Sequence, residues 1–184
     1  MTLEKAMQVY LDTVIVSGMA RGDLEPPEEM AAVHLLAQAD EKDQIKTYTS
    51  RWTWAEQDRA SNYLVRVKLR EARGKIEVVT DDHRVLGFWK LEDSRLGTVS
   101  TNPIVTDFPD EALFSDIKKA GISDDDAKHL MYAVHNKCDR FVTLDTRDLL
   151  PKRATVEPLC RGMRLVMPSE LVAELSDHEG ECSQ

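Results

Sequence analysis

Gln8-Val-Tyr-Leu-Asp12 is a short β-prone run that ends on an aspartate, and Thr13-Val-Ile-Val-Ser-Gly-Met-Ala20 follows it directly. The first run predicts a buried strand, and the second predicts a short helix that ends near Gly22. A strand followed at once by a helix is typical of chains that build a parallel sheet covered by helices.

The rest of the chain repeats this alternation. Pro26-Pro27-Glu28-Glu29 is expected to begin a helix that runs to about residue 40, because proline suits a first turn and acids suit the positive end of the helix dipole. Further strands are expected at residues 45–50, 76–80, 140–145 and 163–167, and further helices at residues 51–74, 123–137 and 169–175. The alternation predicts an α/β sandwich with a mainly parallel central sheet.

One long segment, residues 81–114, shows no clear pattern. Within it, Phe88, Trp89 and Leu91 are expected to be buried because they are large and apolar. Residues 97–103 are expected to form a loop, since they begin with a glycine and end with a proline.

Composition indicates a single globular domain. The chain has 184 residues, a formal net charge of −9 and 42% hydrophobic residues. We expect one domain over residues 1–175 and a disordered acidic tail over residues 176–184. There is no apolar run long enough for a membrane span and no secretory signal, so a cytoplasmic location is expected. The three cysteines are far apart, which favours reduced thiols over a disulfide framework or a zinc site.

Four acidic residues lie at the ends of predicted strands or in the first turns of predicted helices, where ligand-binding residues of α/β proteins can lie. Asp12 and Asp145 end predicted strands, Glu56 follows a strand at the start of a helix, and Asp126 lies in the first turn of the helix at 123–137. Ligands of parallel sheets bind beyond the carboxyl ends of the strands. Carboxylates gathered there repel one another unless a cation or raised pKa values offset the repulsion. Oxygen ligands suit Mg²⁺ or Mn²⁺, and such ions activate water for attack on a phosphodiester.

Each acid also has a purely structural interpretation. Asp12 could cap the following helix, and Glu56 could be an ordinary exposed helix acid. Ser123 and Asp126 have the spacing of a capping box, and Asp145 could open a turn through its side chain. The two kinds of role can coexist at one residue.

Four segments resemble, in order, the motif blocks of PIN domains: Val9–Ile15, Thr49–Glu56, Asp126–Ala133 and Cys138–Leu149. That family consists of metal-dependent ribonucleases with a three-layer α/β/α sandwich, and it includes the VapC-type toxins of bacterial toxin–antitoxin pairs. The resemblance implies the same fold and the same reaction class for this chain. Residues 81–108 align with nothing in the family.

The resemblance also implies which residues form the site. It assigns catalytic and metal-binding roles to four acids, Asp12, Glu56, Asp126 and Asp145. Asp148 matches a further acid of the metal site, and Thr143 matches a small hydroxyl residue that we place near the substrate. The implied cofactor is Mg²⁺ or Mn²⁺. The implied partners are an RNA substrate, an antitoxin protein and a second copy of the chain in a homodimer.

Two basic segments flank these acids in an otherwise acidic chain. Residues 51–75 contain seven Lys or Arg against three acids, and residues 146–164 contain five against two. A basic rim around an acidic centre would hold the phosphates of a nucleic acid, and we assign Arg51, Arg59 and Arg147 to it. The alternative is that these are solvated helix faces.

The aromatic residues and the histidines provide less information about function. Trp52 and Trp54 could stack on bases, although at least one of them is expected to pack in the core. His129 and His135 lie six residues apart on one predicted helix and do not share a face. All five histidines are therefore interpreted as non-ligands.

The leading hypothesis is a Mg²⁺- or Mn²⁺-dependent endoribonuclease. One alternative is a non-catalytic PIN-like protein that binds RNA or serves as a scaffold, although retained acids that repel one another weigh against it. Another is a phosphatase-like or receiver-like protein with Asp12 as phosphate acceptor. No second aspartate lies within two residues of Asp12, which disfavours that alternative.

Overall fold

The computed structural model describes residues 6–60, 62–79, 84–92, 99–106 and 108–181, and it describes side chains for 6–60, 62–72, 74–79 and 108–177. In these residues, five strands form one parallel sheet in the order β3-β2-β1-β6-β7. The strands are β1 Met7–Leu11, β2 Ile45–Thr49, β3 Glu77–Val78, β6 Arg140–Val142 and β7 Arg164–Val166. Every neighbouring pair in this sheet is parallel, so the predicted sheet is confirmed.

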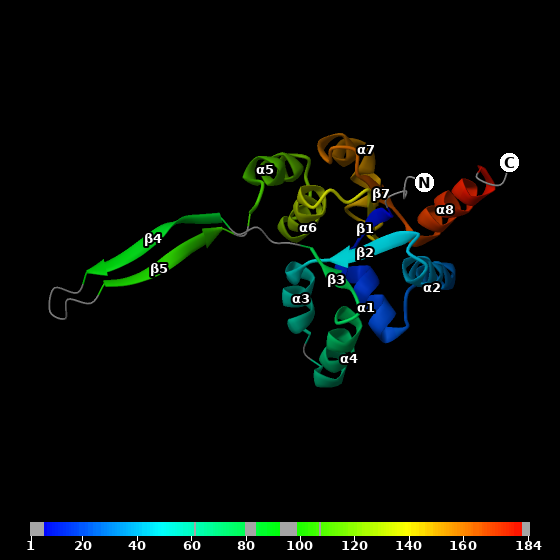
Figure 1. The fold of residues 1–184 in the computed structure, drawn as a ribbon, viewed down its shortest axis with the longest axis horizontal. Coiled ribbons are helices and arrows are strands. Elements are labelled where there is room, and N and C mark those ends of the chain that lie inside the picture. The colour runs from blue at the N-terminus through cyan, green and yellow to red at the C-terminus, as the bar shows by residue number, and fades with distance from the viewer. Residues whose placement is uncertain (1–5, 61, 80–83, 93–98, 107, 182–184) are drawn as a thin grey trace.

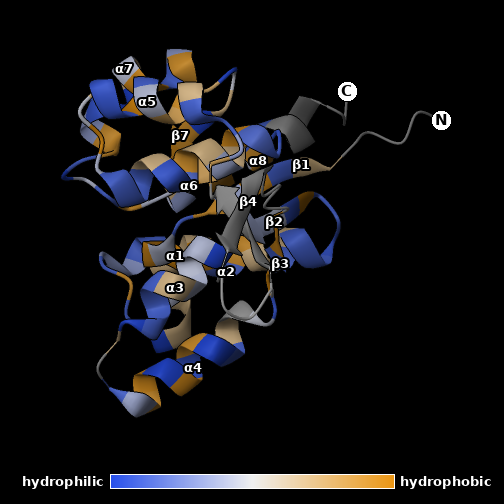
Figure 2. Cartoon of the chain, turned by 90° about the vertical axis from the view of Figure 1, so that its left-hand side faces the viewer, coloured by the Kyte–Doolittle hydropathy of each residue, from blue (hydrophilic) through white to orange (hydrophobic). Residues whose placement is uncertain are grey.

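Helices cover both faces of the sheet and make a three-layer α/β/α sandwich, as expected (Figure 1). The helices are α1 Thr13–Arg21, α2 Pro27–Glu41, α3 Arg51–Asp58, α4 Tyr63–Arg73, α5 Glu111–Lys119, α6 Asp124–His135, α7 Arg153–Val156 and α8 Pro168–Glu181. Figure 2 shows α5, α6 and α7 on one side of the strands and α1, α3 and α4 on the other, with hydrophobic and hydrophilic residues alternating along them.

Alternate residues of the central strands build two separate cores. In β1, Tyr10 packs with the buried residues of α5 and α6, whereas Val9 and Leu11 pack with those of α1, α2 and α8. In β6, Phe141 and Val142 divide in the same way. This alternation determines which face of the sheet each side chain of a strand occupies. It therefore also determines which side chains lie at the carboxyl edge of the sheet.

The first strand and helix meet without a loop, as predicted. Asp12 is the N-cap of α1, and Gly22 ends the helix with a φ of 73°, in the left-handed region that glycine tolerates.

Gly18, inside α1, is required for a different reason. A Cβ at this position would stand 2.0 Å from Cδ2 of Leu24, so the side chain of Leu24 occupies the space that any larger residue would need.

The segment without a clear pattern contains a hairpin and a helix. Strands β4 Arg84–Glu92 and β5 Val99–Thr106 pair antiparallel and extend away from the sheet in Figure 1, and α5 follows them. The loop expected at 97–103 is therefore wrong for residues 99–103. Proline is tolerated there because both strands of a two-stranded hairpin are edge strands. The predicted burial of Phe88, Trp89 and Leu91 lies outside the described side chains.

The C-terminal helix is longer than expected. Residues 176–181, predicted to lie in a disordered tail, continue α8, and residues 182–184 lie outside the described part of the chain. Leu171 and Leu175 anchor this helix to the core, which explains why it persists through a polar sequence. No helix in the described residues is both long and apolar enough to cross a membrane.

The interpretation of the cysteines as free thiols holds for the two that the structure describes. Cys138 and Cys160 are buried and unpaired. Burial first, and then the charges of Asp139 and Glu157 respectively, raise the pKa of each thiol to about 12. Thiols with such a pKa are poor nucleophiles, so neither is a candidate for catalysis.

Candidate active site

Four of the predicted acids line one pocket of about 380 Å³ at the carboxyl edge of the sheet. Asp12 follows β1, Glu56 lies on α3, Asp126 lies in the first turn of α6, and Asp145 follows β6. The remaining lining residues are Thr13, Val14, Leu144, Thr146 and Arg147. Four separate elements thus bring together acids that are distant in sequence.

Asp12 is held rigidly and is only 6% exposed. Its Oδ1 accepts a hydrogen bond of 2.6 Å from the backbone N–H of Thr13, and its Oδ2 accepts one of 2.6 Å from the hydroxyl of Thr143. Burial is the main effect that raises the pKa of Asp12, and the charge of Asp126 adds to it against the opposing effects of His129 and the two hydrogen bonds. Asp12 is therefore both a helix cap and a buried acid of the pocket whose ionised form is disfavoured.

Asp126 is tied to Ser123 in the predicted capping arrangement. Its backbone N–H donates to Oγ of Ser123 at 3.2 Å, and that hydroxyl donates to Oδ2 of Asp126 at 2.5 Å. Burial is again the largest effect that raises the pKa of Asp126, and repulsion from Asp145 and Glu56 raises it further against Ser123 and His129. The pKa values of Asp12 and Asp126 are therefore raised mainly by burial, and repulsion between the carboxylates of the pocket adds to the effect.

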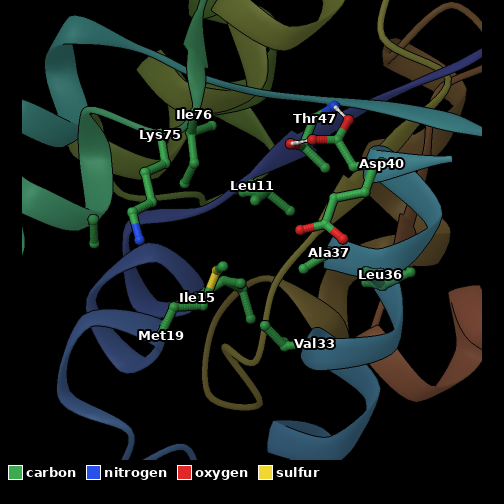
Figure 3. A pocket seen from close by; sticks show the side chains of 12 residues that line it. Leu11, Ile15, Met19, Val33, Leu36, Ala37, Asp40, Thr47, Lys75 and Ile76 are labelled. Atoms are coloured by element: carbon green, nitrogen blue, oxygen red, sulfur yellow. Dashed lines mark hydrogen bonds between the residues drawn. The ribbon is translucent and has the colours of Figure 1, made fainter. Parts of the chain in front are cut away.

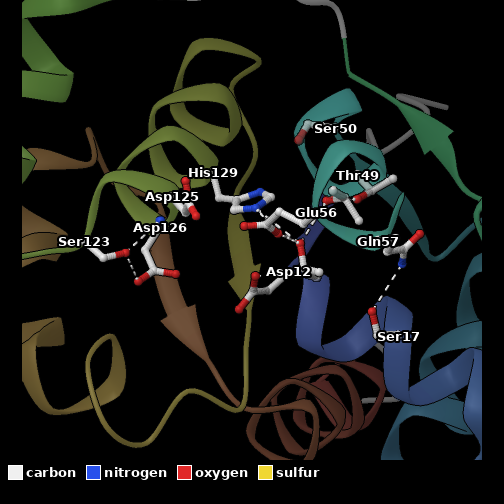
Figure 4. A network of polar contacts seen from close by, with 12 residues as sticks. Asp12, Ser17, Thr49, Ser50, Glu56, Gln57, Ser123, Asp125, Asp126 and His129 are labelled. Atoms are coloured by element: carbon white, nitrogen blue, oxygen red, sulfur yellow. Dashed lines mark hydrogen bonds and ion pairs between the residues drawn. The ribbon is translucent and has the colours of Figure 1, made fainter. Parts of the chain in front are cut away.

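Glu56 differs from the other acids because it has a buried histidine beside it (Figure 4). Nε2 of His129 lies 3.0 Å from Oε2 of Glu56, and the hydroxyl of Thr13 donates to the same oxygen. Burial alone would raise the pKa of Glu56, but the hydrogen bond and charge of His129, together with Thr13, outweigh it and lower the pKa.

The place of His129 was not expected from the sequence. His135 is six residues away from His129 and lies on another face of α6, whereas Asp126 is three residues before it. Residues three apart share a helix face. That spacing is the signal that could have placed His129 beside the acids.

Asp145 and Thr143 form a short turn after β6. Oδ1 of Asp145 accepts from the backbone N–H groups of Arg147 at 2.8 Å and Asp148 at 3.0 Å, which is the predicted turn. Thr143 is fully buried and its hydroxyl donates to Asp12, so it does not face the pocket, where a substrate would bind. The carboxylate of Asp148 pairs with Nζ of Lys152 at 3.1 Å and does not line the pocket.

The predicted basic rim is only partly at the pocket. Arg147 lines it, whereas Arg59 pairs with Asp125 at 3.4 Å, and Arg51 lies exposed in the first turn of α3 outside the lining. Trp52 packs against the core, as expected for at least one tryptophan. Nζ of Lys128 stands 3.6 Å from the centroid of the Trp52 ring, so a base would have to displace that ammonium group to stack there.

The donor set suits a hard divalent cation by its chemistry. Four carboxylates line one pocket, and burial, with a smaller contribution from neighbouring acids, raises the pKa values of Asp12 and Asp126. In the described residues, however, no three His, Cys, Asp or Glu side chains stand close enough to hold one ion. Ion binding would therefore require side-chain rotations that draw the carboxylates together.

A second pocket, of about 300 Å³, lies between α1 and α2 (Figure 3). It is lined mainly by apolar side chains, among them Ile15 and Val33, with Asp40 at its edge. The carboxylate of Asp40 accepts hydrogen bonds of 3.0 Å from the backbone N–H and the hydroxyl of Thr47. None of the predicted acids lines this pocket, so it carries none of the chemistry inferred from the sequence.

Comparison with known proteins assigns no family to the chain. No family model, no curated protein and no solved structure matches it. An inference about function therefore rests on the geometry of the acid-lined pocket.

Proposed function

We propose that the protein is a Mg²⁺- or Mn²⁺-dependent endoribonuclease that hydrolyses RNA phosphodiester bonds at the acid-lined pocket. The observation that carries the proposal is the convergence of Asp12, Glu56, Asp126 and Asp145, from four different elements, on one pocket. The motif blocks that resemble PIN domains contribute these same residues. An antitoxin and a homodimer belong to the same proposal, because the resemblance to VapC-type toxins implies them. A cytoplasmic location is also part of the proposal.

The residues of the pocket would divide the work in a defined way. A divalent ion, when bound, would polarise the phosphodiester and lower the pKa of an attacking water. Asp12 is the most rigid of its candidate ligands because both of its oxygens are fixed by hydrogen bonds. Arg147, at the mouth of the pocket, would hold a phosphate oxygen of the RNA strand and keep the bond to be cleaved in place.

The environment of Asp12 disfavours the phosphate-acceptor alternative. No second aspartate lies within two residues of Asp12, as a phosphatase loop or a receiver pocket would require. The non-catalytic alternative is favoured by one observation, the separation of the acids in the described residues. Metal binding distinguishes that scaffold from the proposed nuclease.

The test is RNA cleavage with Mn²⁺ and with a chelator, combined with calorimetry of Mn²⁺ binding. The proposal predicts cleavage that needs the ion and is lost in Asp145→Asn. A protein that binds Mn²⁺ but leaves a mixed RNA pool intact would indicate a nuclease with a narrow substrate. A protein that neither binds Mn²⁺ nor cleaves RNA would indicate the scaffold.

A further inference from the structure

A chain of buried polar groups runs through the core beneath the acid-lined pocket. The hydroxyl of Tyr10 lies 2.7 Å from Oγ of Ser50 and 2.7 Å from Nδ1 of His129, whose Nε2 reaches Glu56 at 3.0 Å. Ser50, Tyr10 and His129 are each at most 2% exposed. The chain links the end of β2, the middle of β1, α6 and α3, and it ends at the pocket.

Packing alone does not account for this chain. Burying a hydroxyl and an imidazole is unfavourable unless every polar atom finds a partner, and a buried network stabilises only when it is fully satisfied. An apolar side chain at position 129 would fill the same space, between Tyr10 and α3, without that requirement. The hydrogen bonds of His129 therefore indicate a role for the residue they reach, Glu56.

Both nitrogens of His129 are occupied. An ionised carboxylate can only accept, so Nε2 is the donor to Glu56, while Nδ1 is engaged by Tyr10. The ring has no nitrogen left to bind an ion, which agrees with its interpretation as a non-ligand. Its remaining capacity is to fix the orientation of its neighbour.

Glu56 has one fixed oxygen and one open oxygen. Oε2 accepts from His129 and Thr13, whereas Oε1 has no hydrogen-bond partner within the described part of the chain, and the residue lines the pocket. In a metal-binding carboxylate, one oxygen commonly accepts hydrogen bonds from an outer-shell partner while the other binds the ion, and Glu56 has this arrangement of oxygens. Removing such partners typically weakens metal binding by about 10–100-fold.

We propose that His129 is the positioning residue for Glu56: backed by Tyr10 and Ser50, it fixes Oε2 so that Oε1 faces the ion-binding centre. This inference rests on the proposed metal-dependent function, and it adds a residue that the motif blocks did not mark. Glu56 is then a preset ligand beside the fixed carboxylate of Asp12, and Asp126 and Asp145 would close on the ion.

The test is calorimetry of Mn²⁺ binding to the full chain and to five variants. His129→Phe keeps an aromatic ring but removes the donor, and we expect binding weakened by about 10–100-fold. His129→Gln can donate its amide N–H to Glu56 and should restore binding to within about threefold of the wild type. Tyr10→Phe should weaken binding by about threefold or more, since it keeps the ring that stacks on Phe141 at 5.2 Å and removes the hydroxyl that links Ser50 to Nδ1 of His129.

The matched control is His34→Gln, a change of the same type on the exposed face of α2, which should leave binding unchanged. Circular dichroism and thermal melts report whether each variant folds. If His129→Phe does not fold, the Mn²⁺ affinities of His129→Gln and Tyr10→Phe are compared instead. Binding at the wild-type level in Tyr10→Phe then overturns the proposal.

The two proposals fail in different ways. If the wild type binds Mn²⁺ with dependence on Asp12, but folded His129→Phe binds equally well, only the positioning role is overturned. If the wild type does not bind Mn²⁺, or if Asp12→Asn binds it as tightly, the metal-dependent function is overturned and the role of His129 with it.

Discussion

The hydroxyl of Thr143 donates a 2.6 Å hydrogen bond to Oδ2 of Asp12, across a sequence separation of 131 residues. The same oxygen of Thr143 accepts from the backbone N–H of Asp145 at 3.0 Å. One buried threonine thus joins the two acids that end β1 and β6. The pairing of these neighbouring strands brings the first and last acids of the site together.

We expect Thr143→Val to lower the free energy of unfolding by about 1–3 kcal/mol, because it leaves Oδ2 of Asp12 and the N–H of Asp145 without their partner. The side-chain shape is nearly unchanged. Thr143→Ser keeps the hydroxyl and should lose less than half as much. Urea unfolding measures both values, and equal stabilities for Val and Ser would show that the hydrogen bonds contribute little.

Asp12→Asn should stabilise the fold at neutral pH in the absence of divalent ions. Burial raises the pKa of Asp12 on folding, so its ionised form is less favourable in the folded chain than in the unfolded one. Asparagine keeps an acceptor for the N–H of Thr13 and removes the charge. Thermal melts should show a higher midpoint for the variant, and adding Mg²⁺ should raise the midpoint of the wild type alone. A lower midpoint for Asp12→Asn would contradict this account.

Asp110 provides a pH-dependent contact away from the site. Its carboxylate caps α5 through the N–H of Leu113 at 3.0 Å and pairs with Arg161 at 2.6 Å. The cap is the main cause that lowers the pKa of Asp110, and Arg161 lowers it further against partial burial. A lowered pKa means that this stabilisation is present above the unfolded value and is lost as the pH falls through the folded value.

Asp110→Ala should therefore destabilise the fold by about 1 kcal/mol at neutral pH, mostly through loss of the cap. Asp110→Asn keeps a capping oxygen and should cost less. The difference between wild type and Asp110→Ala should shrink in acid, as the native carboxyl takes up a proton. A difference that stays constant from neutral to acid pH would argue against an ionised cap.

Gly18→Ala tests the close approach of α1 to Leu24. Alanine favours a helix interior over glycine by about 1 kcal/mol, but here its methyl group would meet Cδ2 of Leu24 at 2.0 Å. We expect a net loss of about 1–2 kcal/mol from overpacking. Adding Gly18→Ala to Leu24→Ala should then be neutral or stabilising, and a loss of the same size in both backgrounds would place the cause elsewhere.

Much of the fold could be predicted because its signals are local. Residues 45–50 were predicted as a strand and form β2, and the proline pair followed by acids begins α2 as expected. The hairpin of β4 and β5 was missed because its pairing, Arg84 with Thr106 at the open end, is not local, and because Pro103 favoured a loop.

The residues of the candidate site that directly follow a strand could be predicted from their position in the sequence. The rule that ligands bind at the carboxyl ends of parallel strands placed Asp12 and Asp145 correctly. The burial of Thr143, the pairing of Asp148 with Lys152 and the contact of His129 with Glu56 depend on side-chain packing. Only one of these contacts has a signal in the sequence: the three-residue spacing of Asp126 and His129 places His129 on the helix face of the acids.

The most direct measurement of the central claim is the rate at which the purified chain cleaves a mixed RNA pool with Mn²⁺, compared with Asp12→Asn and Asp23→Asn. Asp23 is an exposed acid outside the pocket lining, so its variant carries the same change of charge without touching the site. We predict equal rates for wild type and Asp23→Asn, a rate lower by about 100-fold or more for Asp12→Asn, and none with chelator. Cleavage by Asp12→Asn at the wild-type rate, or cleavage that persists without divalent ions, would contradict the account.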